Sequence, residues 1–377
     1  MLTHTVARCG VADSERGGAP SAAARKRQAG LWRRIAREWW GAIDSSFIRN
    51  AQSWSDGFAA IAAPPLLRPA APAAAAEPPV AAGPTRIVVA AIGDTGGASG
   101  EDMAEAYRGL AQPLPLKGGA ADPEPLRTAL LAEFPHLGDA IDRITGDLRL
   151  RRRAGLAWVR FRPVLLVGPP GIGKTRLAKR LARLLDLGYG EVSGAGSSDD
   201  RMLRGTARGW RGAQPALPLL VMLRTGGANP LIVVDEVDKA GGSARNGDIR
   251  QTLLAMLEVE TARAWFDEAL LAPADLSGVS WLLTANDLAP LSAPLLSRVA
   301  VVRAPAPGPE AFDPLLAGIL GAIAEELGVD AAALPPLAPA ARDRLRRGFV
   351  ARPDLRRIRR AVESALCVGT ATDAPSR

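Results

Sequence analysis

Cysteine and histidine are nearly absent from this chain of 377 residues, which contains two of each. Cys9 and Cys367 lie at opposite ends of the sequence, so their spacing fits neither a metal site nor a redox pair. Such sparse use of cysteine is typical of proteins from a reducing compartment. With only His4 and His136, the chain has little material for histidine-based catalysis or metal binding.

Long apolar runs are missing as well. No stretch reaches the roughly 20 apolar residues that a helix needs to cross a bilayer. The N-terminus lacks the charged and then apolar order of a secretory signal. We therefore expect a cytoplasmic protein without a transmembrane segment.

Acidic residues are outnumbered, because 47 Lys and Arg residues face 39 Asp and Glu residues, which gives a formal net charge of +8. An excess of basic residues suits a nucleic acid or another phosphate-rich partner. Arginines on a solvated surface produce the same excess. Composition alone leaves both interpretations open.

The length indicates roughly two to three domains. The part from Pro64 to Pro84 is mostly alanine and proline, which is typical of a flexible linker. We predict a poorly ordered region at 1–85, a linker at 86–124, an α/β nucleotide-binding subdomain with a helical lead-in at 125–304, a helical lid at 305–368 and a tail at 369–377.

One segment of the N-terminal region stands out, from Arg25 to Ile48. Trp32, Ile35 and Trp39 fall on one helical stripe, with arginines beside it. The segment predicts an amphipathic helix that docks on a partner or a membrane surface, or one that packs on the body of its own protein.

The strongest signal is a short apolar run, a glycine-rich loop and the start of a helix. Gly168, Gly173, Lys174 and Thr175 match the pattern G-x-x-x-x-G-K-[ST]. Glycines let backbone N–H groups cradle phosphate oxygens at a helix N-terminus, Lys174 can reach the β- and γ-phosphates, and Thr175 can bind Mg²⁺. The pattern predicts ATP and Mg²⁺ as cofactors, with contacts from Gly168, Pro169, Pro170, Gly171, Ile172, Gly173, Lys174, Thr175 and Arg176.

A second signal is the run of four apolar residues at 231–234 that ends in Asp235 and Glu236. This pattern predicts a central parallel strand with carboxylates at its C-terminal edge, where open α/β sheets bind ligands. Asp235 is expected to hold the magnesium ion opposite Thr175, and Glu236 to act as general base toward the attacking water. Acids at a strand end also serve as helix caps, but their place after the phosphate loop favours the functional interpretation.

Three further polar residues have both a functional and a plain structural interpretation. Asn286 follows a third predicted strand at 279–284 and either orients the attacking water or occupies a turn. Arg298 ends a short predicted helix and is either an arginine finger that reaches a neighbouring subunit's nucleotide or a surface residue. Arg352 precedes the last lid helix and could reach the γ-phosphate. The arginines within that helix, at 356, 357, 359 and 360, and those at 151–153 are expected to be solvated.

Together these residues resemble an AAA+ ATPase and, more narrowly, the ATPase module of the Lon protease family. The run 235–239, D-E-V-D-K, is similar to the family's D-E-I-D-K, and the run 284–286 matches its T-A-N. Further similarities cover the glycine-rich segment around Trp210, the helix at 253–258, and the stretches 294–298 and 351–355. The resemblance extends over about residues 130–368.

The resemblance implies a P-loop α/β sheet with flanking helices, a helical lid, and roles for individual residues. Asn286 would be sensor 1, Arg298 the arginine finger and Arg352 sensor 2. Trp210 and Arg211 would lie on the pore loop of a homo-oligomeric ring of six subunits, where an aromatic side chain grips a polypeptide; the alternative for Trp210 is a place in the core. Arg211 stands where the family usually has an apolar residue.

We therefore expect an ATP-hydrolysing motor that remodels or threads a protein substrate. The chain ends soon after the lid helices, so we expect no peptidase activity of its own. A separate protease or another partner could bind through the N-terminal region. The alternatives are a nucleic-acid-associated AAA+ ATPase and a nucleotide-dependent scaffold with little turnover.

Overall fold

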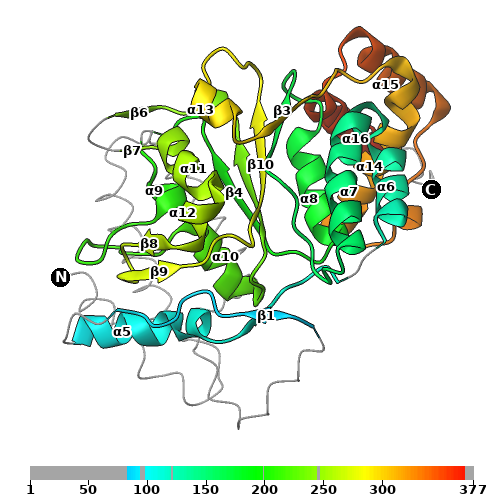
Figure 1. The fold of residues 1–377 in the computed structure, drawn as a ribbon. Coiled ribbons are helices and arrows are strands. Elements are labelled where there is room, and N and C mark those ends of the chain that lie inside the picture. Colours follow the sequence, from blue (N-terminus) through cyan, green and yellow to red (C-terminus); the bar gives the residue numbers. More distant parts are fainter. Residues whose placement is uncertain (1–82, 94–97, 120–121, 198, 244–246, 370–377) are drawn as a thin grey trace, which may run out of the picture. The chain divides into compact units, whose positions relative to one another are not determined.

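A parallel five-stranded sheet forms the centre of the fold, with strand order β11-β3-β10-β5-β4 (Figure 1). The computed structural model describes residues 83–93, 98–119, 122–197, 199–243 and 247–369, all within the unit formed by residues 80–377. The predicted helix at 25–48 lies outside the described residues. The strands are β3 (Val164–Val167), β4 (Tyr189–Ser193), β5 (Leu231–Asp235), β10 (Ser280–Ala285) and β11 (Ala300–Arg303).

The middle strands are apolar on both faces because helices cover both sides of the sheet. In β3, Val164 and Leu166 pack into one core cluster, while Leu165 and Val167 pack into another. The first cluster includes α6 (Pro123–Glu133), α7 (Gly138–Arg153) and α8 (Lys174–Leu184). The second includes α10 (Leu217–Thr225), α11 (Ile249–Leu257) and α12 (Val259–Arg263). This arrangement, seen on either side of β10 in Figure 1, confirms the predicted α/β class.

Several shorter elements connect the main strands and helices. Two hairpins are formed by β6 (Gly242–Ser243) with β7 (Gly247–Asp248), and by β8 (Trp265–Asp267) with β9 (Ala272–Ala274). The remaining short helices are α9 (Arg201–Arg204), α13 (Ala293–Leu296), and the 3₁₀ turns η1 (Arg108–Ala111), η2 (Pro135–Leu137), η3 (Val237–Lys239), η4 (Pro309–Ala311) and η5 (Ala331–Ala333).

The segment before α6 packs onto the α/β body. Strands β1 (Thr85–Arg86) and β2 (Leu114–Pro115) pair antiparallel, and α5 (Ala98–Tyr107) lies between them in sequence. Val88, Val89 and Leu110 are buried in the same cluster as the second helix layer. This stretch therefore contributes to the core. The boundaries that we expect for the linker at 86–124 and for the other domains remain predictions.

Three helices follow the sheet and have a core of their own. These are α14 (Phe312–Leu327), α15 (Pro339–Ala351) and α16 (Leu355–Gly369), whose apolar faces meet in a separate cluster. They correspond to the helical lid that the sequence predicts after residue 304. The Leu355 N–H donates to the Gly171 carbonyl at 2.8 Å, so this lid contacts the phosphate loop. Among the described helices, none has the length and apolar character that a membrane span requires; the cytoplasmic location stays a prediction.

Candidate functional site

The phosphate loop connects β3 to α8 and depends on its glycines. Gly171 and Gly173 have φ values of 78° and 98°, a region that side chains disfavour. At Gly168, a Cβ atom would lie 1.9 Å from the Ala304 carbonyl oxygen on the adjacent β11 segment, so only glycine fits. His136 Nε2 lies 2.9 Å from the Ile172 carbonyl and supports the loop from behind. The sequence thus produces a tight loop that leads into a helix N-terminus.

Lys174 lies at the first turn of α8 and is almost completely buried. Its Nζ donates to the carbonyls of Gly168 at 2.6 Å and Pro169 at 2.9 Å, and to Asn286 Oδ1 at 3.2 Å. Burial lowers the pKa of Lys174, and the nearby carboxylate of Asp235 opposes that shift. A buried cation held only by neutral oxygens is a favourable partner for phosphate.

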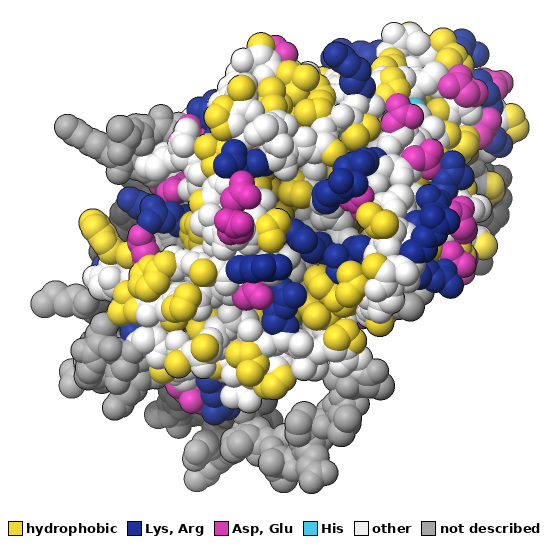
Figure 2. Space-filling view, viewed as in Figure 1, with side chains coloured by type: hydrophobic (Ala, Val, Ile, Leu, Met, Phe, Trp, Pro, Cys, Tyr) yellow, Lys and Arg dark blue, Asp and Glu magenta, His cyan; other side chains and the backbone are white. Residues whose placement is uncertain are grey.

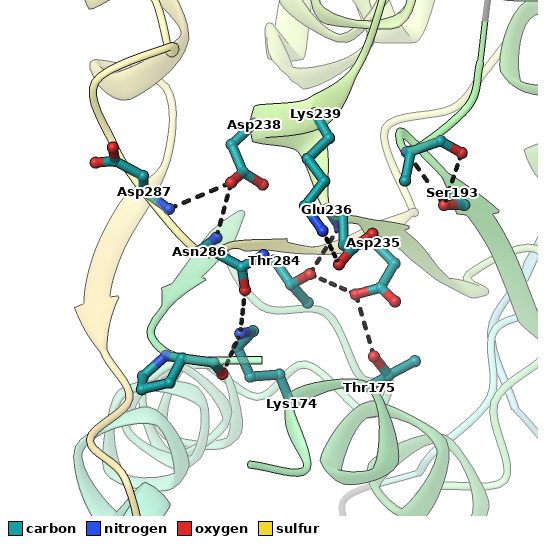
Figure 3. A network of polar contacts seen from close by, with 12 residues as sticks. Lys174, Thr175, Ser193, Asp235, Glu236, Asp238, Lys239, Thr284, Asn286 and Asp287 are labelled. Carbon is teal, nitrogen blue, oxygen red and sulfur yellow. Dashed lines mark hydrogen bonds and ion pairs between the residues drawn. The ribbon is translucent and has the colours of Figure 1, made fainter. Parts of the chain in front are cut away.

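Asp235, at the end of β5, faces the start of α8. Its Oδ1 accepts hydrogen bonds from Thr175 Oγ1 at 3.1 Å and from the hydroxyl of Thr284 on β10 (Figure 3). Hydroxyl and carboxylate oxygens are ligands that Mg²⁺ prefers. Within the described residues, no group of three or more His, Cys, Asp and Glu side chains could hold a metal ion. The Thr175 hydroxyl and the Asp235 carboxylate have the chemistry of a Mg²⁺ site, whose remaining ligands would come from phosphate and water.

Glu236 follows Asp235 with an unusual backbone. Its φ is 52°, in the left-handed region, and its N–H donates to Thr284 Oγ1 at 2.9 Å. Lys239 Nζ lies 2.5 Å from Glu236 Oε1, as Figure 3 shows. Such strain in a non-glycine residue is common at functional sites. Thr284 is fully buried and contacts both the Asp235 carboxylate at the end of β5 and the backbone of Glu236 that follows, a role that the T-A-N match did not suggest.

Asn286 is held in place through its backbone. Asp238 Oδ2 accepts the N–H groups of Asn286 at 3.1 Å and Asp287 at 3.3 Å. The Asn286 amide oxygen consequently points at Lys174 rather than into a turn (Figure 3). The structure therefore brings Asn286 together with the phosphate loop and with Glu236 around one cavity.

The cavity is lined from both the sheet and the lid. Residues 170–176 line it together with Asp235, Glu236, Thr284 and Asn286. Gly168 and Pro169 do not line it, and contact Lys174 through their carbonyls instead. From the lid come Ile319, Ala322, Leu355, Arg356 and Arg359.

The arginines that line the cavity differ from the one that the sequence favoured. Arg352 is exposed and is not among the lining residues. Arg356, which is exposed as the sequence predicts, and the half-buried Arg359 both line it, because the first turns of α16 face the phosphate loop. Arg359 also pairs with Glu363 at 2.8 Å and with Glu326. The hydrogen bond from Leu355 to Gly171 fixes the start of α16 on the phosphate loop, and this determines which arginines of the helix line the cavity. The sequence alone does not show this contact.

Arg298 lies apart from the cavity of its own chain. Its Nε is 3.1 Å from Glu258 Oε2, and its Nη1 donates to the Pro294 carbonyl at 2.9 Å. The structure therefore does not bring Arg298 together with the other predicted catalytic residues.

Trp210 is on an exposed loop between Thr206 and Gln214, which pair with each other. Its side chain is 70% exposed, so the alternative of a core tryptophan does not fit. Arg211 is also exposed. Arg208 fixes the base of the loop, because its Nε donates to Ala269 O at 2.7 Å and its Nη1 to Gly93 O at 2.6 Å.

Comparison with known proteins agrees with this geometry. Residues 164–304 match the ATPase family associated with various cellular activities (AAA). The chain is 38% identical over 184 residues to a Lon protease of Frankia alni, which is 47% of this chain and 21% of that protein. It is 37% identical over 175 residues to a Lon protease of Desulforamulus reducens, which is 46% of this chain and again 21% of that protein. The chain thus spans about a fifth of the length of these relatives.

Solved structures show the same fold. A structure of a Saccharomyces cerevisiae Hsp104:casein complex has a TM-score of 0.51 at 20% identity, covering 67% of this chain and 48% of that one. A closed-state structure of Hsp104 with ATPγS and FITC casein gives the same values. At this identity the likeness concerns the fold alone. The chain therefore has the P-loop α/β fold, its residues 164–304 match the AAA family, and this region resembles part of the Lon proteases.

Proposed function

We propose that the protein binds ATP with Mg²⁺ and hydrolyses it. The observation that carries this proposal is the convergence of Lys174, Thr175, Asp235, Glu236 and Asn286 around one cavity. Each group has the chemistry that phosphoryl transfer needs, which is mainly positioning and charge stabilisation. A scaffold that only binds nucleotide would not need a carboxylate at Glu236.

Each of these residues has its own role in the proposed hydrolysis of ATP. The N–H groups of the loop and Lys174 bind the phosphates, and Lys174 exchanges its carbonyl partners for phosphate oxygens. Thr175 and Asp235 would hold Mg²⁺, which when bound neutralises charge on the phosphates. Glu236 accepts a proton from the attacking water, after its carboxylate leaves Lys239, and Asn286 orients that water.

The lid supplies further positive charge. Arg356 and Arg359 face the cavity from α16, where a bound nucleotide would lie between them and the phosphate loop. We infer that these two arginines, rather than Arg352, sense the phosphates. Movement of α16 on the loop would then couple nucleotide state to the position of the lid.

We further propose that the protein forms a homo-oligomeric ring, with six subunits as the expected number, and acts on a polypeptide. Trp210 is exposed on a loop anchored by Arg208, and a flat amphipathic ring suits contact with varied polypeptide segments. Arg298 does not line the nucleotide cavity of its own chain, which is expected of an arginine that contacts the nucleotide of a neighbouring subunit. The relatives are named Lon proteases, and Hsp104 is described in complex with casein. These names support a protein substrate here, and a separate protease stays a proposed partner.

A nucleic-acid partner is less well supported. On the face that Figure 2 shows, basic side chains are interspersed with acidic and apolar ones. Many described arginines pair with acids, for example Arg342 and Arg346 with Asp313 at 2.8 and 2.7 Å. A sequence reader would need a recognition element that contacts bases.

The proposal is tested by the ATPase rate of the full chain with and without an unfolded polypeptide. The parent should hydrolyse ATP and be stimulated by the polypeptide. Trp210→Ala should keep the basal rate and lose the stimulation, whereas Arg344→Ala, an exposed control on α15, should keep both. Absent hydrolysis in the parent would contradict the ATPase assignment, and full stimulation of Trp210→Ala would contradict the role of the loop.

A further inference from the structure

Several arginines lie around Trp158, near the amino end of β3 and thus at the opposite end of this strand from the phosphate loop. Trp158 and Arg160 lie just before β3, Arg151 is near the end of α7, and Arg263 ends α12. Arg86 reaches the same place from β1. The phosphate loop follows the carboxyl end of β3, whereas this cluster lies at the amino end. We call these five residues the Trp158 cluster.

Two guanidinium groups stack on the tryptophan. Arg151 Cζ lies 4.0 Å from the Trp158 ring centroid, and Arg86 Cζ lies 5.4 Å from it. Trp158 itself packs against the main core. The ring therefore fixes the guanidinium groups in place through cation–π contact. The expectation that Arg151 is a solvated helix end is wrong, because the side chain is partly buried on the tryptophan.

Acidic partners cover only part of this charge. Arg86 pairs with Asp275 at 3.2 Å and donates to Ser277 Oγ at 2.9 Å. The nearby Asp147 is engaged by Arg162 at 2.7 Å. Across the described ranges, no residue accepts a hydrogen bond from the guanidinium group of Arg151 or Arg160, and Arg151 Nε and Nη2 and Arg160 Nε are buried without a partner. Arg151 Nη1 and both Nη atoms of Arg160 are not among the buried atoms without a partner.

The arginines also repel one another. Burial lowers the pKa of Arg160, and Arg86 and Arg263 lower it further, against the opposing effect of Asp275 and Asp147. Burial likewise lowers the pKa of Arg151, together with Arg160 and Arg86. Partly buried charges without partners are costly, so a fold that keeps several of them together gains from an added anion.

We propose that the Trp158 cluster binds an oxyanion of the phosphate class. A carboxylate has two oxygens that lie in one plane, whereas phosphate has up to four oxygens in a tetrahedral arrangement and can therefore accept from more guanidinium groups at once. Arg151 and Arg160 are the principal ligands, and Arg263 adds charge from α12. Because this site is at the opposite edge of the sheet, it is separate from the ATP cavity.

The test is titration of inorganic phosphate into the full chain, measured by calorimetry at fixed ionic strength. The chain carries Lys174→Ala, so that the ATP cavity contributes little. One site should be found. Adding Arg160→Gln should weaken binding at least about tenfold, the scale of one lost charge-assisted hydrogen bond. Adding Arg344→Gln, which removes an equal charge elsewhere, should leave the affinity unchanged.

A second variant distinguishes loss of phosphate binding from loss of folding. Arg151→Gln should weaken binding in the same way, and the thermal shift that phosphate produces in the Lys174→Ala chain should disappear in both variants. Circular dichroism checks that each variant is folded. Unchanged phosphate affinity in folded Arg160→Gln and Arg151→Gln chains, or no binding to the Lys174→Ala chain, would overturn the proposal.

Discussion

Lys174 Nζ donates a hydrogen bond of 3.2 Å to the amide oxygen of Asn286. The two residues are 112 positions apart in the chain and lie at the carboxyl ends of neighbouring strands, since β3 and β10 pair in parallel. This bond connects the group that binds phosphate with the group that we expect to orient water. Asp238 fixes the Asn286 end of the contact through two backbone N–H groups.

Replacement of Asn286 should therefore affect turnover more than binding. We expect Asn286→Ala to lower kcat about 10²-fold, the usual effect of removing one preorganised polar group from a catalytic site. The dissociation constant for ATP should change only a few-fold, because Lys174 and the N–H groups of the phosphate loop, which bind the phosphates, are unchanged. Steady-state kinetics and equilibrium binding measure the two effects. Asp287→Asn, at the exposed next position, serves as control, and a kcat equal to that of the parent would refute the role of Asn286.

The lid arginines offer a direct comparison of two assignments. Arg356 lines the cavity and Arg352 does not. We expect Arg356→Ala to weaken ATP binding about tenfold, as loss of a charge-assisted contact implies, and Arg352→Ala to leave it nearly unchanged. Titration with a fluorescent ATP analogue distinguishes the two. The reverse order of effects would support the assignment made from the sequence.

Arg298 is expected to act on the nucleotide of a neighbouring subunit. Arg298→Ala and Lys174→Ala should each lack ATPase activity, because the first lacks the finger and the second the phosphate ligand. A mixture of the two should regain a measurable rate, since some interfaces pair an intact cavity with an intact finger. Mixing Arg298→Ala with the double variant Lys174→Ala/Arg298→Ala is the control and should regain none. No recovery in the first mixture would count against a shared site.

The burial of Lys174 predicts a pH dependence of ATP binding. Burial lowers the pKa of Lys174 below its ordinary value of 10.5. Deprotonation removes the charge that attracts phosphate, so the affinity should decline as pH rises through the lowered pKa. The decline should begin at a lower pH than for an ordinary lysine. Equilibrium binding between neutral pH and pH 10 tests this, and Lys174→Ala should show weak binding without that decline.

The sequence predicts the part of the site that depends on local order. Val164 to Thr175 and Leu231 to Glu236 each combine a strand with the residues that follow it, and parallel strands bring such ends to one edge. The strands predicted at 231–234 and 279–284 therefore agree with β5 and β10 to within one residue at each end.

Contacts that depend on packing between distant elements could not be predicted in this way. Thr284 contacts both acids only because β10 and β5 align in one register. Arg356 and Arg359 line the cavity only because Leu355 docks on Gly171. Arg151 turns onto Trp158, a residue seven positions further on, where the helical pattern had indicated solvent.

The central claim is that Glu236 activates water for hydrolysis at a site that binds ATP without it. The most direct measurement follows ATP binding and phosphate release in one preparation of Glu236→Gln. We predict affinity for ATP close to that of the parent and a rate lowered by about 10²-fold or more, the usual contribution of a general base. Phosphate release at the parental rate by Glu236→Gln would contradict the account.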